Sequence, residues 1–406
     1  GANYSSQDFG SRRSTSVIED DDPRNDFVPG EWEALAALPN LSLSGWIDFD
    51  AIALIGGEHP LLPSVLAQEP DVVEFFTIFT DEFGAPIYPS VMLVRKTAPK
   101  IARGIDALTS FTSAVCAAAI VDFRCGRIVH NQPFGVAYSE AFDLYPWFPA
   151  RGHQGHVSSW TPAGGGFHEL AKLRPQSGPG VRANRLERSL VDQVLIDALR
   201  SCWIRAFVKG ESTEHLSLFR SLEMARAASR APGGVDATIH DIGRIVALWV
   251  SAFEILIHDG RADKKRVHEF LMRCSWLHRE LQKLDRHIMF RRDDRTKTNL
   301  AGGLLDALYR TRNDFLHGNP VTDKSMRFES SERSIDAFGA PIYRLLLGSA
   351  LSLDHDEGVP EGAGVDDFAE AVCRACDRRN SQRLAERAIL AAVQSQGHDR
   401  DVGEQT

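Results

Sequence analysis

The sequence predicts an α+β protein, in which a mixed α/β N-terminal domain is followed by an all-α helical bundle. Short apolar segments typical of strands, such as "WIDFDAIALI" and "SVMLVRK", occur in the first half of the chain. After residue 186 the apolar residues recur at helical spacing in one segment after another. Proline and glycine cluster between the two patterns, in "PQSGPGVRAN" at 175–184, and this cluster predicts the domain boundary.

A chain of 406 residues is longer than one ordinary domain, so we divide it into four parts. Residues 1–30 are polar and charged and predict a disordered lead-in. Residues 31–177 form the α/β domain and residues 186–350 the helical bundle. Residues 351–406 comprise an acidic loop, a C-terminal helix and a tail.

In the N-terminal domain, three apolar segments predict strands or short buried segments: "WIDFDAIALI", "VVEFFTIFT" and "SVMLVRK". The glycine-rich "TPAGGGFHE" at 161–169 lacks the Gly-Lys-Ser/Thr ending of a phosphate-binding loop and predicts a turn. Aromatic residues crowd into 138–148. Their commonest role is to build the edge of a core, and base stacking is the less favoured alternative.

The helices of the bundle are expected in order along the chain. The segment "DIGRIVALWVSAFEILIHDG" has a broad apolar stripe and predicts a central helix. We also expect helices at "LERSLVDQVLIDALRSCWIRAF", "HLSLFRSLEMARAASR", "VHEFLMRCSWLHRELQKLDRHI", "TNLAGGLLDALYRTRNDFLHG" and "APIYRLLLGSALSL". The last helix is expected at about 368–394.

Composition excludes several classes of protein. Hydrophobic content of 43% with 25% charged residues is typical of a soluble globular protein. The longest apolar run, at 114–121, is far shorter than the roughly 20 residues that cross a bilayer. With no secretory signal evident, we expect a cytoplasmic protein without a membrane partner. Six dispersed cysteines predict no disulfide framework, and the Cys373–Cys376 pair lacks the second pair of a zinc site, so neither metal nor cofactor is expected.

The formal net charge is −9, yet basic residues are in excess in one part of the chain. Residues 181–320 hold 24 lysines and arginines against 18 aspartates and glutamates. The densest basic segments are "RADKKR" and "HIMFRRDDRTK", and their sign suits a polyanion such as RNA. The candidate RNA-binding residues are Lys264, Lys265, Arg266, Arg291, Arg292 and Arg295. A solvated helix face and loop is the more common alternative for such runs.

The strongest chemical signal is "RTRNDFLHGNP", late in the chain. Arg312 and His317 are five residues apart, a spacing that occurs three times in the sequence and proves little alone. Here, however, Asn313 shares a helix face with His317, and Gly318 predicts the helix end. A histidine can donate and accept protons near neutral pH, while an arginine can hold a phosphate through two hydrogen bonds. A polar helix end that merely faces water is the alternative.

These residues resemble the HEPN superfamily, specifically its Apea-like branch. The resemblance rests on "RNDFLHG" in a late helix, preceded by a helix ending "ALWVSAFEILIH", and it covers about 186–350. Many HEPN proteins are metal-independent ribonucleases with an RNxxxH motif. The resemblance therefore implies Arg312, Asn313 and His317 as the catalytic set and Glu254 as a supporting residue, for which a structural role is the alternative. Asp314 is expected to be solvated or paired.

The resemblance also implies a homodimer in which the two motif helices face each other and form one composite site for RNA. Apea-like proteins commonly carry an unrelated N-terminal domain and are associated with abortive infection against phage. We therefore expect a toxin or anti-phage effector, with an antitoxin or a phage-derived trigger as a further partner, and residues 31–177 as the sensor or restraint. The alternative function is a non-catalytic scaffold module that binds RNA or a nucleotide.

Overall fold

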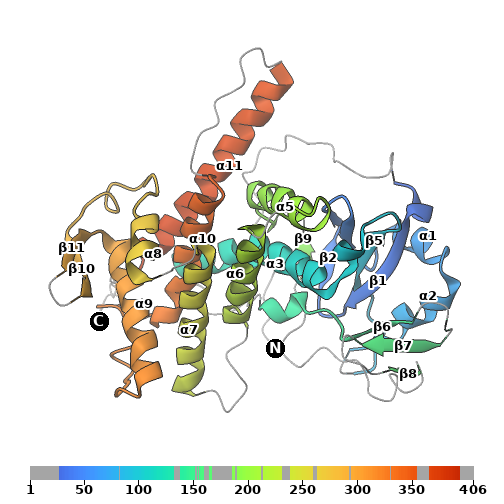
Figure 1. Cartoon of the computed structure of the whole chain (residues 1–406), viewed down its shortest axis with the longest axis horizontal. Helices are drawn as coiled ribbons and strands as arrows, with labels where there is room; N and C mark the ends of the chain where they lie inside the picture. Colours follow the sequence, from blue (N-terminus) through green and yellow to red (C-terminus); the bar gives the residue numbers. More distant parts are fainter. Residues whose placement is uncertain are drawn as a thin grey trace, which may run out of the picture.

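The computed structural model confirms the α+β class, with a small antiparallel sheet at one end and helices at the other (Figure 1). It describes residues 27–81, 83–131, 138–150, 153, 155–159, 164–166, 185–187, 190–211, 214–230, 238–258, 263–291, 294–329, 331–353 and 365–393. Most of the predicted lead-in, the whole predicted boundary at 175–184 and the acidic loop at 354–364 lie outside these residues.

The main sheet has four antiparallel strands in the order β1-β5-β4-β3. Its strands are β1 (Trp32–Leu38), β3 (Trp46–Asp48), β4 (Ile52–Ile55) and β5 (Ser90–Arg95). The predicted strand segments "WIDFDAIALI" and "SVMLVRK" are thereby confirmed, the first as a hairpin that turns at Asp50, where φ is 66°. These strands are buried almost throughout, since both faces of the sheet are covered.

One face of the sheet packs against α1 (Leu62–Leu66) and α2 (Pro70–Thr77). The segment "VVEFFTIFT" is therefore helical in its first part, where strands were among the expected elements; Pro70 at the helix start favours this conformation. Phe75 and Phe79 are fully buried and pack edge to face with each other. Beside them a small sheet is formed by β6 (Trp147–Pro149), β7 (His156–Ser159) and β8 (Gly164–Gly166). The centre of the predicted turn at 161–169 is thus a strand.

The other face of the sheet packs against α3 (Ile105–Val129), which runs from the sheet into the helical part (Figure 1). Alanine, serine and cysteine fill the middle of α3 and allow neighbouring helices to approach closely. Those neighbours are α5 (Gln193–Phe207), α6 (Glu214–Ala228), α10 (Gly339–Ala350) and α11 (Val365–Leu390). By length and composition α3 could cross a membrane, but 78% of its apolar window is buried inside the protein, as expected for a core helix.

The position of α3 bears on the predicted division of the chain. The boundary expected at 175–184 separates α3 from the helices against which it packs. A parallel pairing of β2 (Ser42–Ser44) with β9 (Arg185–Glu187) also joins the two parts. Because one continuous core includes residues of the sheet, α3 and the later helices, deleting residues 31–177 would remove a core helix rather than a separate domain.

The helical part is centred on α7 (Ile239–Leu256), which contacts α6, α10 and α9 (Leu300–His317). Its N-terminus is fixed by a capping box between Thr238 and Asp241. Trp249 is fully buried at the crossing with α10, where any side chain larger than that of Gly339 would clash with its ring. The central helix predicted from the apolar stripe is therefore confirmed. The remaining short elements are 3-10 helices at Pro29–Glu31, Lys100–Arg103, Ser139–Phe142 and Ile335–Phe338.

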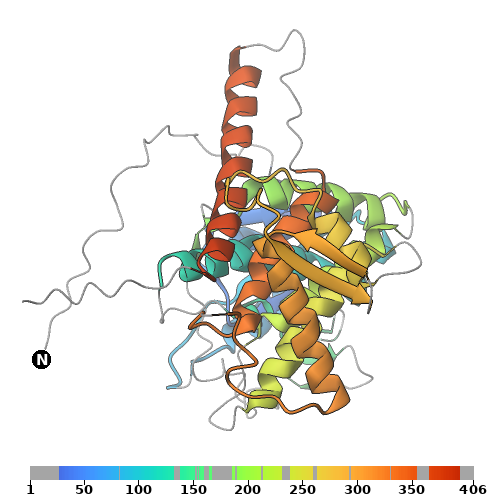
Figure 2. The ribbon, with the colours of Figure 1, turned by 90° about the vertical axis from the view of Figure 1, so that its left-hand side faces the viewer.

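The prediction of an all-α bundle is wrong in one segment. The helix expected from "VHEFLMRCSWLHRELQKLDRHI" is only α8 (Lys264–Leu271), and the chain then turns into a hairpin of β10 (Arg286–Arg291) and β11 (Asp294–Thr298). Burial alternates along the hairpin, with Ile288 and Thr298 turned inward. This two-residue period places one face on α9 and the other in solvent (Figure 2).

The last helix, α11, begins three residues before the predicted start and ends at Leu390. Its first half stands clear of the body in both views (Figures 1 and 2), while its second half packs against α3 and α10. Glu386 anchors this second half. Its carboxylate is fully buried and accepts hydrogen bonds from Leu277 N (3.0 Å), His278 N (2.8 Å) and Gln382 Nε2 (2.9 Å).

Replacing Glu386 with alanine is expected to lower the free energy of unfolding by about 1 to 3 kcal/mol, because buried backbone donors lose their acceptor. Glu280→Ala provides the matched control, since Glu280 is exposed and pairs only with Lys283 in the described part of the chain. Its effect should stay below about 0.5 kcal/mol. Urea unfolding of both variants measures the difference, and equal stabilities would contradict the anchoring role of Glu386.

Candidate functional site

The RNxxxH residues lie in the last two turns of α9. Asn299 caps the start of this helix by accepting from Gly302 N, and Gly318 ends it in the left-handed conformation, with φ at 70°. Glycine favours this conformation because it lacks a Cβ. The helix therefore ends directly after His317, as the sequence predicts.

Asn313 and His317 are exposed on one face of α9. Neither side chain makes a hydrogen bond or ion pair within the described part of the chain, so both are available to a ligand. Leu316 lies beside them, and its side chain is 62% exposed. The polar motif residues thus share an open surface with an apolar side chain.

Arg312 is held in place from the neighbouring helix. Its Nη1 lies 3.7 Å from Glu254 Oε1 of α7, so the structure brings together Arg312 and the residue expected to have a supporting role. The guanidinium also lies 6.0 Å from the ring centre of Tyr309. Because both partners are only partly buried, this ion pair contributes little to stability, and its main effect is to orient the arginine.

Tyr309 also belongs to this cluster, although it is not among the site residues predicted from the sequence. Burial, together with the nearby carboxylate of Glu254, raises the pKa of its phenol well above the usual value, so the hydroxyl stays protonated. Tyr309 lies three residues before Arg312 and hence on the same side of α9. That spacing was the one sequence signal for it, but an aromatic residue at helical spacing is more often part of a core.

Asp314 is a pairing residue, one of the two roles expected for it. Its Oδ1 accepts from Asn319 Nδ2 at 2.8 Å, and its backbone carbonyl accepts from the amides of Gly318 and Asn319. Asp314 therefore closes the end of α9 rather than facing the motif surface.

Packing against α7 fixes the motif end of α9. The ring of Phe315 lies directly over Gly243, where an added Cβ would clash with it, and it also contacts the ring of His240. This close approach positions the last turn of α9, and with it His317, against the first half of α7.

The structure does not bring the predicted RNA-binding residues to the motif. Those that the structure describes belong to α8 and to the hairpin, which pack along the N-terminal half of α9, about two to three helical turns before Asn313. Lys264 is committed to Asp306 and to the carbonyl of Met289, and Lys265 lies 3.2 Å from Asp294. The amide of Arg266 donates to Asp263 at the start of α8.

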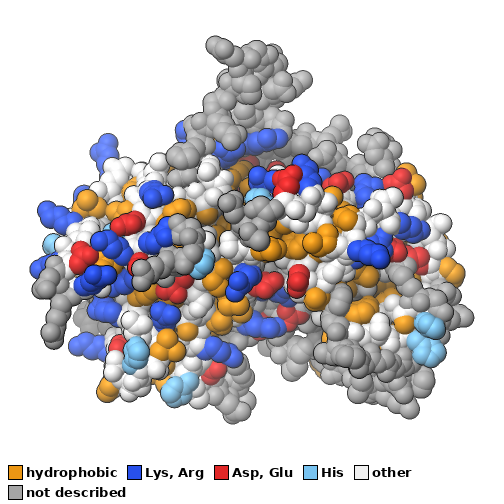
Figure 3. Space-filling view, viewed as in Figure 1, with side chains coloured by type: hydrophobic (Ala, Val, Ile, Leu, Met, Phe, Trp, Pro, Cys, Tyr) orange, Lys and Arg blue, Asp and Glu red, His pale blue; other side chains and the backbone are white. Residues whose placement is uncertain are grey.

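Two predicted residues, Arg291 and Arg295, are exposed on the hairpin, whereas Arg292 lies outside the described residues. In Figure 3, basic side chains gather at the end of the molecule that carries α8 and the hairpin, with acidic ones between them. This surface is mixed in charge, which weakens it as a site for a polyanion on its own.

Within the described ranges no three histidine, cysteine, aspartate or glutamate side chains converge in a way that could hold a metal ion. The Cys373–Cys376 pair is exposed on α11. On the motif surface of α9, the imidazole of His317 is a group of the kind that transfers protons and the guanidinium of Arg312 carries a positive charge.

Comparison of the chain with family models, with curated proteins and with solved structures finds no match.

Proposed function

We propose that this chain is a metal-independent endoribonuclease of the HEPN type, with Arg312, Asn313 and His317 as its catalytic residues. The observation that carries the proposal is the exposed face of α9, where Asn313 and His317 have no partner in the described part of the chain and Glu254 holds Arg312 beside them. Polar side chains that only end a helix do not need an ion pair from the neighbouring helix to hold them in place.

The chemistry follows from the residue types. The ribose 2′-hydroxyl attacks the adjacent phosphorus, the bond to the 5′-oxygen breaks, and the products are a 2′,3′-cyclic phosphate and a 5′-hydroxyl. One group removes the proton of the 2′-hydroxyl, another gives a proton to the leaving oxygen, and a cation stabilises the negative charge on the phosphate. His317 suits the proton transfers, Arg312 suits the charge, and Asn313 suits orientation of the phosphate.

A single copy supplies one motif histidine, whereas the reaction uses both a base and an acid. A homodimer with facing motif helices supplies two histidines and two arginines. The exposed Leu316 supports this arrangement, because its apolar side chain lies within the motif face and would be covered by a second copy.

Leu316→Glu is expected to weaken the dimer by about tenfold or more, because it removes apolar burial and places two like charges together. Leu284→Glu is the control, since Leu284 is also about half exposed but lies before the hairpin, away from the motif. Sedimentation velocity over a concentration series measures both. A wild-type protein that is monomeric throughout, or a dimer that Leu316→Glu leaves unchanged, would contradict the facing arrangement.

A cytoplasmic toxin or anti-phage effector is the biological role proposed with this activity. An antitoxin or a phage-derived trigger would then control the nuclease, and RNA would be its substrate. Since α3 is a core helix, regulation by the N-terminal part is better tested by substitution of exposed side chains on α1 and α2, which cover the sheet, than by deletion of residues 31–177.

The alternative is a scaffold that binds RNA without cleaving it, and the open motif face fits that role as well. To separate the two, purified protein is incubated with total RNA and tRNA in excess EDTA, and the ends of any products are mapped. The proposal predicts cleavage that leaves 2′,3′-cyclic phosphate ends. Binding without cleavage by a protein that is folded and dimeric would favour the scaffold.

A further inference from the structure

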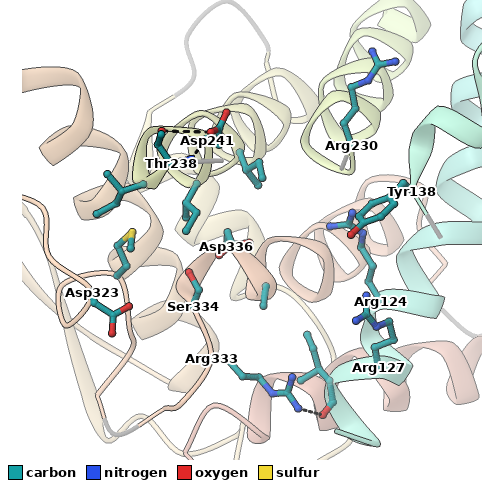
Figure 4. Close-up of a pocket in the computed structure, with 16 residues that line it drawn as sticks. Arg124, Arg127, Tyr138, Arg230, Thr238, Asp241, Asp323, Arg333, Ser334 and Asp336 are labelled. Carbon is teal, nitrogen blue, oxygen red and sulfur yellow. Dashed lines mark hydrogen bonds between the residues drawn. The ribbon is translucent and has the colours of Figure 1, made fainter. Parts of the chain in front are cut away.

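A second site is suggested by a cavity of about 740 Å³ that the motif residues do not line. It lies between the C-terminal end of α3, the end of α6, the start of α7 and residues 323–337 (Figure 4). Its volume falls within the roughly 300 to 1,000 Å³ typical of small-molecule sites.

One side of the cavity is rich in arginine. Arg124 and Arg127 are one turn apart on α3, and Arg333 reaches the same region from the segment before α10 (Figure 4). Burial, and then repulsion from Arg127, lowers the pKa of Arg333, and burial likewise lowers the pKa of Arg124. The fold therefore gathers three arginines on one side of the cavity, where the charge of Asp336 opposes the lowering of the pKa of Arg124.

Two of these three arginines donate to backbone carbonyls and have no ion pair in the part of the chain that the structure describes. Within the described residues neither Arg124 nor Arg333 forms an ion pair; Arg124 donates to the carbonyl of Ser229, and Arg333 donates to Ile128 O and Asn131 Oδ1. The fourth arginine of the cavity, Arg230, is instead paired with Asp143.

Two acidic residues of the lining, Asp241 and Asp323, lie away from Arg124 and Arg127 and have partners of their own (Figure 4). Asp241 accepts from the backbone of Thr238, and Asp323 accepts from Arg327 at 2.8 Å. The third, Asp336, is attracted by Arg124, but burial raises the pKa of this carboxyl group and so disfavours its charged form. Asp336 therefore offsets only part of the positive charge on the arginine side, and among the described residues Arg333 has neutral hydrogen-bond partners alone.

A purely structural role accounts for only part of these arginines. Arg124 and Arg333 do satisfy carbonyls near the ends of α6 and α3, which is a common use of arginine. Each does so through Nη2 alone, however, although a guanidinium has five N–H donors. The donors on Nε and Nη1 make no bond to any described residue, and they can serve a phosphate bidentately.

The rest of the lining suits an apolar ring. Ile242, Ile245 and Met326 provide an apolar wall, and Tyr138 provides an aromatic side chain next to the arginines. A ligand with a phosphate at one end and a planar ring at the other would match both parts of the cavity.

We propose that this cavity binds a small phosphorylated ligand of the nucleoside phosphate class, with the phosphates on Arg124, Arg127 and Arg333. The ring of the ligand packs against the apolar wall. This inference does not depend on the nuclease activity of α9.

Isothermal titration of the full chain with ATP, pyrophosphate and inorganic phosphate, at low ionic strength and without divalent metal, tests the proposal. ATP should bind with an affinity on the order of micromolar, and more tightly than inorganic phosphate. Arg127→Ala and Arg333→Ala should each weaken ATP binding about tenfold to a hundredfold, since each removes a charge-assisted contact. Arg279→Ala, which changes an exposed arginine outside the cavity, should leave binding unchanged.

Thermal unfolding of each variant shows whether it remains folded, which matters most for Arg124→Ala because that side chain is largely enclosed. No ATP binding by folded wild-type protein at millimolar concentration would overturn the proposal, as would binding that neither Arg127→Ala nor Arg333→Ala weakens. Inorganic phosphate that binds as tightly as ATP would refute the role of the ring. A single-stranded oligoribonucleotide that competes through the same arginines and binds more tightly would identify RNA as the occupant instead.

Discussion

Replacing His317 with alanine is expected to lower the rate of RNA cleavage by about two to four orders of magnitude, the usual contribution of general acid–base catalysis. The imidazole is the one group of the motif that can both take and give a proton near neutral pH. His317 is exposed at the end of α9 and has no partner in the described part of the chain. Its removal should therefore leave the melting temperature and the dimer unchanged.

His287→Ala is the matched control, because His287 is also an exposed histidine but lies on β10, away from the motif. It should cleave RNA at the wild-type rate. A loss of activity in His317→Ala that comes with a lower melting temperature would point to a structural role. Full activity in a folded His317→Ala protein would remove the histidine from the mechanism.

Arg344→Met is expected to produce the largest loss of stability, about 3 to 5 kcal/mol at neutral pH. Arg344 is almost fully buried in α10, where Nη2 lies 2.6 Å from Asp192 and Nε lies 3.4 Å from Asp122. Asp192 also caps the start of α5, and Asp122 accepts from Ser381 of α11. Without the arginine, two carboxylates remain in the interior with no cation between them.

The loss should depend on pH. Burial raises the pKa of Asp122, Arg344 opposes this rise, and the charge of Asp192 adds to it. Removing Arg344 therefore raises the pKa of Asp122 further in the folded state. A carboxyl group whose pKa is higher in the folded state than in the unfolded state binds more protons when folded. Its contribution to the free energy of unfolding is therefore full at low pH and is lost as the pH rises through the folded-state pKa. The defect of Arg344→Met should thus be smallest near pH 4 and largest above pH 7.

Asp122→Asn is the control for this prediction. It keeps the pair between Arg344 and Asp192 and retains an acceptor for Ser381, so it should cost less than about 1 kcal/mol and should not share the pH dependence. Urea unfolding of both variants at pH 5 and pH 8 measures the loss of stability and its dependence on pH. A defect in Arg344→Met that is equal at the two pH values would contradict the buried charge cluster.

The sequence predicts those parts of the fold in which one periodicity decides the structure. The apolar stripe of α7 and the strand pair formed by β3 and β4 are such cases. It fails where tertiary contacts override local pattern: residues 272–288 continue a helical spacing, yet the chain leaves the helix after Leu271 and forms the hairpin. The predicted boundary also places α3 in a domain separate from the bundle, because the helices that contact α3 lie up to about 280 residues further along the chain.

The candidate site shows the same limit. Its local part, the helix end at His317 and Gly318, can be predicted from spacing and capping alone. The contact of Glu254 with Arg312 depends on how α7 and α9 cross, and the role of Tyr309 depends on that contact. The arginine-lined cavity joins residues from α3, α6, α7 and the segment before α10, so no short motif could mark it.

In the proposed mechanism, the motif of α9 cleaves RNA through the ribose 2′-hydroxyl. The most direct test uses one defined RNA, first mapped for its cleavage site, and a matched strand with a single 2′-deoxynucleotide at that site, both in excess EDTA. The proposed mechanism predicts that wild-type protein cleaves the first strand and leaves the second intact at that site, and that His317→Ala cleaves neither. Equal cleavage of both strands, or cleavage that EDTA abolishes, would contradict it.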